Sequence, residues 1–169
     1  AVNEIGKLLS DLSDEITVSL GPNTIAVQTI NTAFVSKLID GSDKVNYQRA
    51  IPAGEASTLK VNTKQFSDII SRVSVLSGDR VKGIKLDIGS NGVLVSSNNP
   101  QQEVGEESFK AEFNGDDLEI AFSVNYIQEM LSNIDSEHCV FHIFGSEKGC
   151  LVTSTSDSEL KYVIAPLLL

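Results

Sequence analysis

A pattern of one helix followed by several strands occurs three times in this sequence, and the repeat restricts the folds that the chain can adopt. In the central copy, four apolar residues have the spacing of one stripe on an α-helix: Phe66, Ile69, Ile70 and Val73. The same spacing begins 61 residues earlier at Ile5 and 61 residues later at Ile127 (66 − 5 = 61 and 127 − 66 = 61). We therefore predict helices over residues 2–13, 63–76 and 124–134.

Each predicted helix is followed by three short segments that alternate in polarity or are rich in β-branched residues, with turn residues between them. These segments are residues 15–20, 24–28 and 33–39, then 82–88, 93–97 and 106–113, then 140–144, 150–154 and 159–164. Two copies also have a strand-like segment before the helix, at residues 57–61 and 118–122. The repeat predicts an α+β fold of β-α-β-β-β units, with helices on one side of antiparallel sheets.

The first copy has no strand before its helix, because the repeat offset places Ala1 where the helix cap should stand. Our interpretation is that the natural protein extends further toward its N-terminus and that this chain is a piece of it. Periodicity fails over residues 40–56, where Gly, Ser, Asp, Pro and Ala prevail, so this stretch is the best linker candidate. We expect residues 1–52 to be an incomplete unit with its linker and residues 53–169 to be one complete domain of two pseudo-symmetric halves.

The formal net charge of −10 argues against a surface that coats nucleic acid generally, although a local basic face is compatible with it. No apolar run approaches the roughly 20 residues of a membrane span, and no basic-then-apolar leader pattern is present. We therefore expect a cytoplasmic protein without a membrane partner. In a reducing compartment, Cys139 and Cys150 are interpreted as buried thiols rather than as a disulfide.

The sequence contains no set of residues with the spacing of a catalytic centre. A Walker loop, a nucleophile elbow and a dinucleotide fingerprint are all missing, and the glycines of residues 89–92 link two predicted strands as a turn. His138 and His142 fall on one face of a predicted strand while Cys139 falls on the other, which is a poor arrangement for metal ligands. We predict no enzyme activity, no metal and no cofactor.

Several apolar residues do not fit the predicted core stripes. Val75 and Leu76 stand at the end of the second helix, and Tyr126 lies one step off the stripe of the third. The chain also ends in an apolar tail, residues 163–169, in which Pro166 cannot donate to a strand ladder. Two interpretations of this tail stay open: it closes the core of its own domain, or it lines a groove for a partner.

The order and spacing of six short stretches resemble the C-terminal part of bacterial DNA polymerase III beta subunits, the sliding clamps. The stretches are residues 36–41, 47–52, 75–77, 82–86, 98–103 and 162–167. The resemblance implies a DNA-clamp fold in which two head-to-tail subunits encircle duplex DNA, with sheets outside and helices on the inner face. It also implies a processivity factor without catalysis, of which this chain would hold half of the middle domain and all of the third. The alternative is a non-ring repeat scaffold that binds only proteins.

The resemblance also implies site residues. A groove for peptides of the DNA polymerase III catalytic subunit, the clamp loader and other partners would include Val45, Arg49, Ala50, Tyr126, Val163, Ala165, Pro166 and Leu167. The homodimer patch, an apolar centre with a charged rim, would include Val75, Leu76, Glu103, Glu106 and Glu107. The DNA-facing cations would be Lys7, Lys64 and Arg72, for which a solvated helix face is the alternative. The sequence departs from the family at Val45, Ala165 and Leu168, where Pro, Met and Arg are common.

Overall fold

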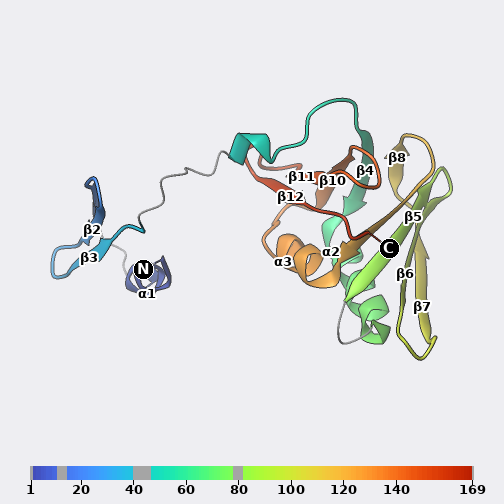
Figure 1. The fold of residues 1–169 in the computed structure, drawn as a ribbon, viewed down its shortest axis with the longest axis horizontal. Coiled ribbons are helices and arrows are strands. Elements are labelled where there is room, and N and C mark those ends of the chain that lie inside the picture. The colour runs from blue at the N-terminus through green and yellow to red at the C-terminus, as the bar shows by residue number, and fades with distance from the viewer. Residues whose placement is uncertain (1, 11–14, 40–46, 78–81, 169) are drawn as a thin grey trace. The chain divides into compact units, whose positions relative to one another are not determined.

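The structure is a computed structural model that describes residues 2–10, 15–39, 47–77 and 82–168. It divides into two compact units, Ala1–Val45 and Asn46–Leu169, and each is considered by itself (Figure 1). The division falls inside the stretch of residues 40–56 in which the sequence loses its periodicity.

The first unit contains one helix and one small sheet. Its elements are α1 (Val2–Ser10), β1 (Thr17–Leu20), β2 (Thr24–Gln28) and β3 (Ala33–Lys37), and the strands pair antiparallel in the order β1-β2-β3. Among its described residues, Val27 is the buried one, whereas Val18, Leu20 and Val35 are exposed apolar side chains. The described residues of this unit therefore bury little apolar surface.

The second unit has two antiparallel sheets and two main helices. Its elements are η1 (Tyr47–Arg49), β4 (Ser57–Asn62), α2 (Thr63–Val73), η2 (Ser74–Leu76), β5 (Gly83–Gly89), β6 (Gly92–Asn98), β7 (Val104–Phe109), β8 (Glu112–Asn114), β9 (Leu118–Ser123), α3 (Val124–Ser132), β10 (His138–Ile143), β11 (Cys150–Ser154) and β12 (Lys161–Ile164). The five-stranded sheet has the order β12-β11-β10-β4-β8, and the four-stranded sheet has the order β7-β6-β5-β9. The predicted α+β fold with antiparallel sheets is confirmed.

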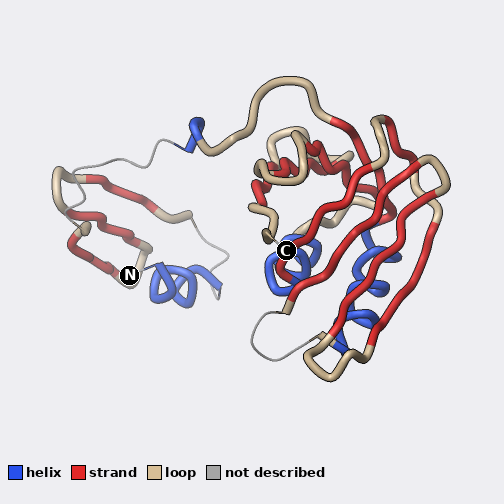
Figure 2. The backbone as a smooth tube through the Cα atoms, turned by 45° about the vertical axis from the view of Figure 1, so that its right-hand side comes forward, coloured by secondary structure: helices blue, strands red, loops and turns tan. Residues whose placement is uncertain are grey.

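The two sheets show how the halves of this unit combine. The first half consists of β4-α2-β5-β6-β7, and its strand β4 pairs with β10 of the second half. The second half consists of β9-α3-β10-β11-β12, and its strand β9 pairs with β5 of the first half. Figure 2 shows the two helices next to the sheets, and α2 and α3 contact each other. Because each half contributes one strand to the other's sheet, neither half completes its sheet alone.

The core of the second unit lies between the helices and the sheets. Strands β5 and β6 alternate, so Leu86 and Val95 point inward and are almost fully buried. The ring of Phe66 on α2 packs against Phe109 and Phe141, with centroids 5.6 Å away in both cases. Aromatic contacts of this kind tie α2 to both sheets.

Some element boundaries differ from those predicted. The segment predicted as one strand over residues 106–113 is two strands, because the chain leaves the four-stranded sheet after Phe109 and enters the five-stranded sheet at Glu112. The second helix is α-helical only to Val73 and continues as a 3₁₀ turn to Leu76. The end of the first predicted helix, residues 11–13, lies outside the described residues.

Candidate interaction surfaces

The C-terminal tail connects the two sheets of the second unit. In β12 the side chains alternate, so that Ile164 is 5% exposed in the core and Val163 is 40% exposed on the opposite face. Beyond Pro166, the amide of Leu167 donates to the carbonyl oxygen of Ala121 in β9 at 2.8 Å. The tail thus begins at the edge of the five-stranded sheet and ends against the edge of the four-stranded one.

The segment before β4 lies against the same edge as β12. A Cβ atom added to Gly149 would lie 3.4 Å from both the Pro52 ring and the Val163 side chain, so these two residues lie close together over Gly149. One turn earlier, Arg49 and Ala50 are exposed, and the Ala50 amide donates to the Tyr47 carbonyl at 3.0 Å. The structure therefore gathers this segment and the tail at one edge of the second unit.

The other predicted groove residues are Tyr126, Ala165, Pro166 and Val45. Tyr126 is 62% exposed on α3, a helix that packs against β12. Within the described part of the chain, no hydrogen bond or ring contact joins Tyr126 to the tail or to Arg49. Ala165 is exposed and Pro166 is half-buried, while Val45 lies outside the described residues.

The predicted dimer patch surrounds the end of α2 and the edge strand β7. Val75 is 78% exposed, and the Leu76 side chain lies against Gly105 of β7. Val104 was not among the predicted residues, yet it is 55% exposed on the same strand. Val104 stands an odd number of positions before the inward-pointing Phe109, and residues spaced in this way point to opposite faces of a strand. The sequence could therefore have predicted that Val104 is exposed.

Two contacts hold β7 and its neighbour β6 to the end of α2. The buried hydroxyl of Ser97 donates to the carbonyl oxygen of Val73 at 2.6 Å. The guanidinium of Arg72 donates to both carboxylate oxygens of Glu107, at 2.6 Å from Nη2 and 2.9 Å from Nε. This hydrogen-bonded ion pair raises the pKa of Arg72 and lowers the pKa of Glu107.

The predicted carboxylate Glu103 and the predicted cations Lys64 and Lys7 also have close partners. Glu103 accepts a hydrogen bond from the side-chain amide of Asn99 at 2.6 Å. Lys64 pairs with Asp68 at 3.0 Å, and Lys7 pairs with Glu4 at 3.1 Å. All three cations predicted to face DNA are therefore paired with carboxylates, which reduces the positive potential that they project.

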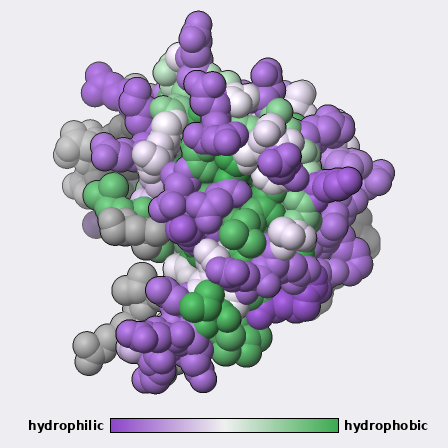
Figure 3. All heavy atoms as spheres, turned by 90° about the vertical axis from the view of Figure 1, so that its right-hand side faces the viewer, coloured by the Kyte–Doolittle hydropathy of each residue, from purple (hydrophilic) through white to green (hydrophobic). Residues whose placement is uncertain are grey.

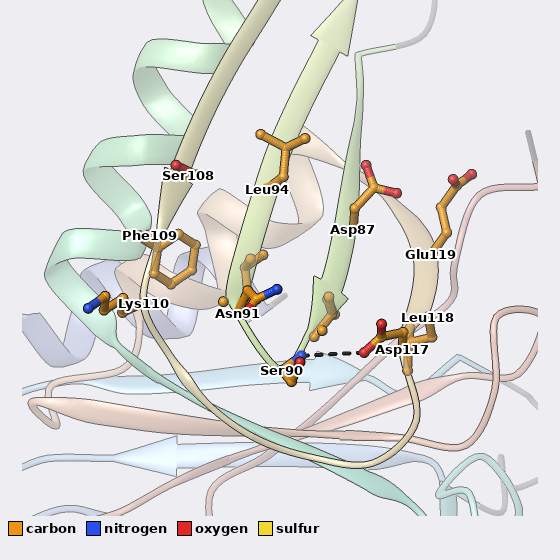
Figure 4. Close-up of a pocket in the computed structure, with 14 residues that line it drawn as sticks. Asp87, Ser90, Asn91, Leu94, Ser108, Phe109, Lys110, Asp117, Leu118 and Glu119 are labelled. Carbon is orange, nitrogen blue, oxygen red and sulfur yellow. Dashed lines mark hydrogen bonds between the residues drawn. The ribbon is translucent and has the colours of Figure 1, made fainter.

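A cavity of about 840 Å³ lies beside the β5–β6 turn, on the outer side of the four-stranded sheet (Figure 4). Asp117 accepts a hydrogen bond from the Ser90 amide at 3.3 Å. Lys85 bridges the carboxylates of Asp87 and Glu119 at 3.2 and 3.1 Å, and hydrogen bonds to Glu119 and then Asp87 raise the pKa of Lys85. Two of the carboxylates that line the cavity, Asp87 and Glu119, are therefore already paired with a cation.

The described residues include no group of His, Cys, Asp and Glu side chains able to hold a metal ion. Cys139 and Cys150 are buried free thiols, as predicted, and burial raises their pKa values to about 11 and about 12. His142 shares a hydrogen bond with the hydroxyl of Thr153 at 3.0 Å. In the described part of the chain, no helix is long and apolar enough to cross a membrane.

Comparison with known proteins agrees with this architecture. Residues 48–168 match the family model described as DNA polymerase III beta subunit, C-terminal domain. The chain is 34% identical to the beta sliding clamp of Pseudomonas aeruginosa over 165 residues, and 28% identical to that of Vibrio cholerae over 166 residues. These matches cover 97% and 98% of the chain but only 44% and 45% of the two relatives.

Solved structures give the same result. A crystal structure of the Pseudomonas aeruginosa sliding clamp bound to griselimycin is similar with a TM-score of 0.93 at 32% identity, covering 99% of this chain and 45% of that one. The sliding clamp of Bartonella birtlesii is similar with a TM-score of 0.92 at 31% identity, covering 99% of this chain and 48% of that one. The chain thus spans slightly less than half of the relatives that it matches.

Proposed function

Since this chain belongs to the family of DNA polymerase III beta subunits, the sliding clamps, we propose that it contributes to a processivity factor that encircles duplex DNA. The family consists of non-catalytic processivity factors. In this proposal, residues 1–52 are the second half of a middle domain with its linker, and residues 53–169 are the C-terminal domain. The complete protein is a cytoplasmic homodimer that holds the DNA polymerase III catalytic subunit, the clamp loader and other clamp-binding proteins.

The observation that carries this proposal is the exchange of β4 and β9 between the two halves of the second unit. It gives a domain with two helices side by side and two sheets behind them. Domains of this shape, placed end to end, present helices toward a central hole and sheets toward the outside. Function therefore follows from assembly rather than from a reactive centre.

The paired helix cations support sliding rather than tight binding. Lys64 and Arg72 each face a carboxylate, so a DNA phosphate that contacts either cation must compete with Asp68 or Glu107. Such contacts release little free energy and weaken steeply with salt. Retention on DNA then depends on ring closure.

The gathered tail and linker support a docking role at the edge of the second unit. Val163, Arg49 and Ala50 are exposed there, next to Pro52. An exposed apolar surface beside a cation suits a short peptide with apolar anchors and polar backbone groups. We propose that a peptide with a Gln followed by Leu and Phe anchors binds here.

Primer extension on a long single-stranded circular template tests this function. The full-length protein, its clamp loader and the polymerase catalytic subunit should give products much longer than the polymerase alone gives. A variant truncated after Pro166 should lose part of this gain, because the groove loses one wall. Products of unchanged length with and without the full-length protein would contradict the proposal.

A further inference from the structure

The sequence contains two Asn-Gly steps, and the structure holds them differently. Asn91-Gly92 stands in the turn between β5 and β6, whereas Asn114-Gly115 stands between β8 and β9. Figure 3 views the molecule from the side on which Figure 1 draws β5 to β8, and hydrophilic residues predominate there around a few apolar patches. Asn91 and Asn114 are both exposed, and within the described residues neither side-chain amide makes a hydrogen bond.

An Asn-Gly step can react with itself in water. The backbone nitrogen of the glycine attacks the side-chain carbonyl carbon of the asparagine. A new N–C bond forms, the bond to the side-chain nitrogen breaks, and ammonia leaves with the proton of the glycine N–H. Water then opens the cyclic imide on either side and gives aspartate or isoaspartate. Glycine permits the attack because it has no Cβ in the way, and the attack requires a backbone N–H that is free to give up its proton.

The backbone of Gly92 is held in a sheet. Gly92 is the first residue of β6 and pairs with Gly89 of β5. A Cβ atom added to Gly92 would overlap the carbonyl oxygen of Phe109, so the backbone of β7 also lies against this glycine. Attack by the Gly92 nitrogen on Asn91 therefore requires the end of the hairpin to open first.

The backbone of Gly115 is not held in this way. Gly115 follows the last residue of β8, and within the described part of the chain its amide makes no hydrogen bond. Its φ is +157°, and a Cβ atom added to it would overlap the side chain of Ser57. Both observations restrict this position to glycine. The turn thus requires the residue type that leaves Asn114 open to attack.

We propose that Asn114 is a site of spontaneous deamidation and that its isoaspartate product loosens β8. This strand has three residues and pairs with β4 at the edge of the five-stranded sheet, where Asn114 stands opposite Thr58. Isoaspartate adds a carbon atom to the backbone and a negative charge close to Asp116 and Asp117 in the sequence. The pairing opposite Thr58 is then lost, and Phe113, which packs half-buried against the core, loses its support.

Two variants test the effect on β8. In Asn114→Gln an extra methylene separates the side-chain carbonyl from the backbone, so the ring closes much more slowly. Asn91→Gln is the matched control and should age as the wild type does. Hydrogen exchange at the backbone amides of Thr58 and Phe113 should become faster in the aged wild type and in aged Asn91→Gln, but not in aged Asn114→Gln. Unchanged exchange in chains that carry isoaspartate at position 114 would overturn the proposed loosening.

Incubation of the 169-residue chain at mildly alkaline pH for several weeks, followed by digestion and mass spectrometry, tests the site itself. Isoaspartate should accumulate at Asn114 at least about fivefold faster than at Asn91, because the hairpin at Gly92 must open before Asn91 can react. In concentrated urea, where the strands are lost, the two rates should be similar. Equal rates in the folded chain, a faster reaction at Asn91, or the same preference for Asn114 in urea would overturn the proposal.

Discussion

Arg72 and Glu107 form a bidentate ion pair that fastens the last turn of α2 to the edge strand β7. The resemblance assigned these residues to different surfaces, Arg72 to the DNA side and Glu107 to the dimer interface. Each is the other's partner in this structure. The pair therefore links the predicted DNA face to the predicted subunit contact. A substitution at either residue should alter both surfaces.

Charge reversal tests this link. We expect Arg72→Glu and Glu107→Arg each to weaken the full-length dimer, because each places two like charges at the end of α2. The double variant restores the attraction and should recover most of the lost dimer affinity. Sedimentation equilibrium measures all four proteins. Losses that simply add in the double variant would show that the two residues act separately.

The pH dependence of unfolding provides a second test. Because the hydrogen bonds from Arg72 lower the folded-state pKa of Glu107 below its ordinary value of 4.5, Glu107 stabilises the fold above that value. This contribution should be lost as the pH falls through the lowered pKa. The difference in unfolding free energy between wild type and Glu107→Gln, measured by urea denaturation, should be present at pH 7 and shrink toward pH 3. A difference that grows on acidification would have the wrong sign.

Leu76 should be a hot spot of the homodimer. It follows the exposed Val75 and lies against Gly105 of the edge strand β7, so a partner surface that covers this edge would contact it. Leu76→Ala in the full-length protein should weaken the dimer by about 1 to 3 kcal/mol. The matched control is Ile30→Ala, an exposed apolar residue of the first unit. An unchanged dissociation constant for Leu76→Ala in sedimentation experiments would remove it from the interface.

The backbone bond from Leu167 to Ala121 should stabilise the second unit. Leu167→Pro removes the donor and should lower the unfolding free energy of the 169-residue chain by about 0.5 to 1.5 kcal/mol, plus any strain. Leu168→Pro is the control, because among the described residues the Leu168 amide makes no backbone hydrogen bond. Equal urea midpoints for the two variants would mean that the tail is not held at β9.

Local patterns in the sequence predict most of the fold. The apolar stripes predict α2 and α3, because helix period depends on residues only three or four positions apart. Alternation predicts β5 and β6 but not the change of sheet between Phe109 and Glu112, since side chains can keep alternating while the backbone changes partner. The predicted strand over residues 106–113 was wrong for that reason.

The candidate surfaces were harder to predict because they depend on contacts between distant residues. Arg72 and Glu107 are 35 positions apart, and their pairing follows from how β7 packs on α2. The bond between Leu167 and Ala121 depends on which strands are neighbours and in which register. Exposed apolar residues such as Val75 and Tyr126 were detectable because they break a helical stripe. To detect Val104, one must know which residues of its strand point outward.

Retention on DNA of different topology tests the central claim most directly. The full-length protein, loaded onto a nicked circular plasmid and washed in high salt, should stay bound and should dissociate within seconds once the plasmid is cut at one site. The 169-residue chain alone should be retained on neither form. Retention of the full-length protein on both circular and linear DNA, or on neither, would contradict the ring that this account requires.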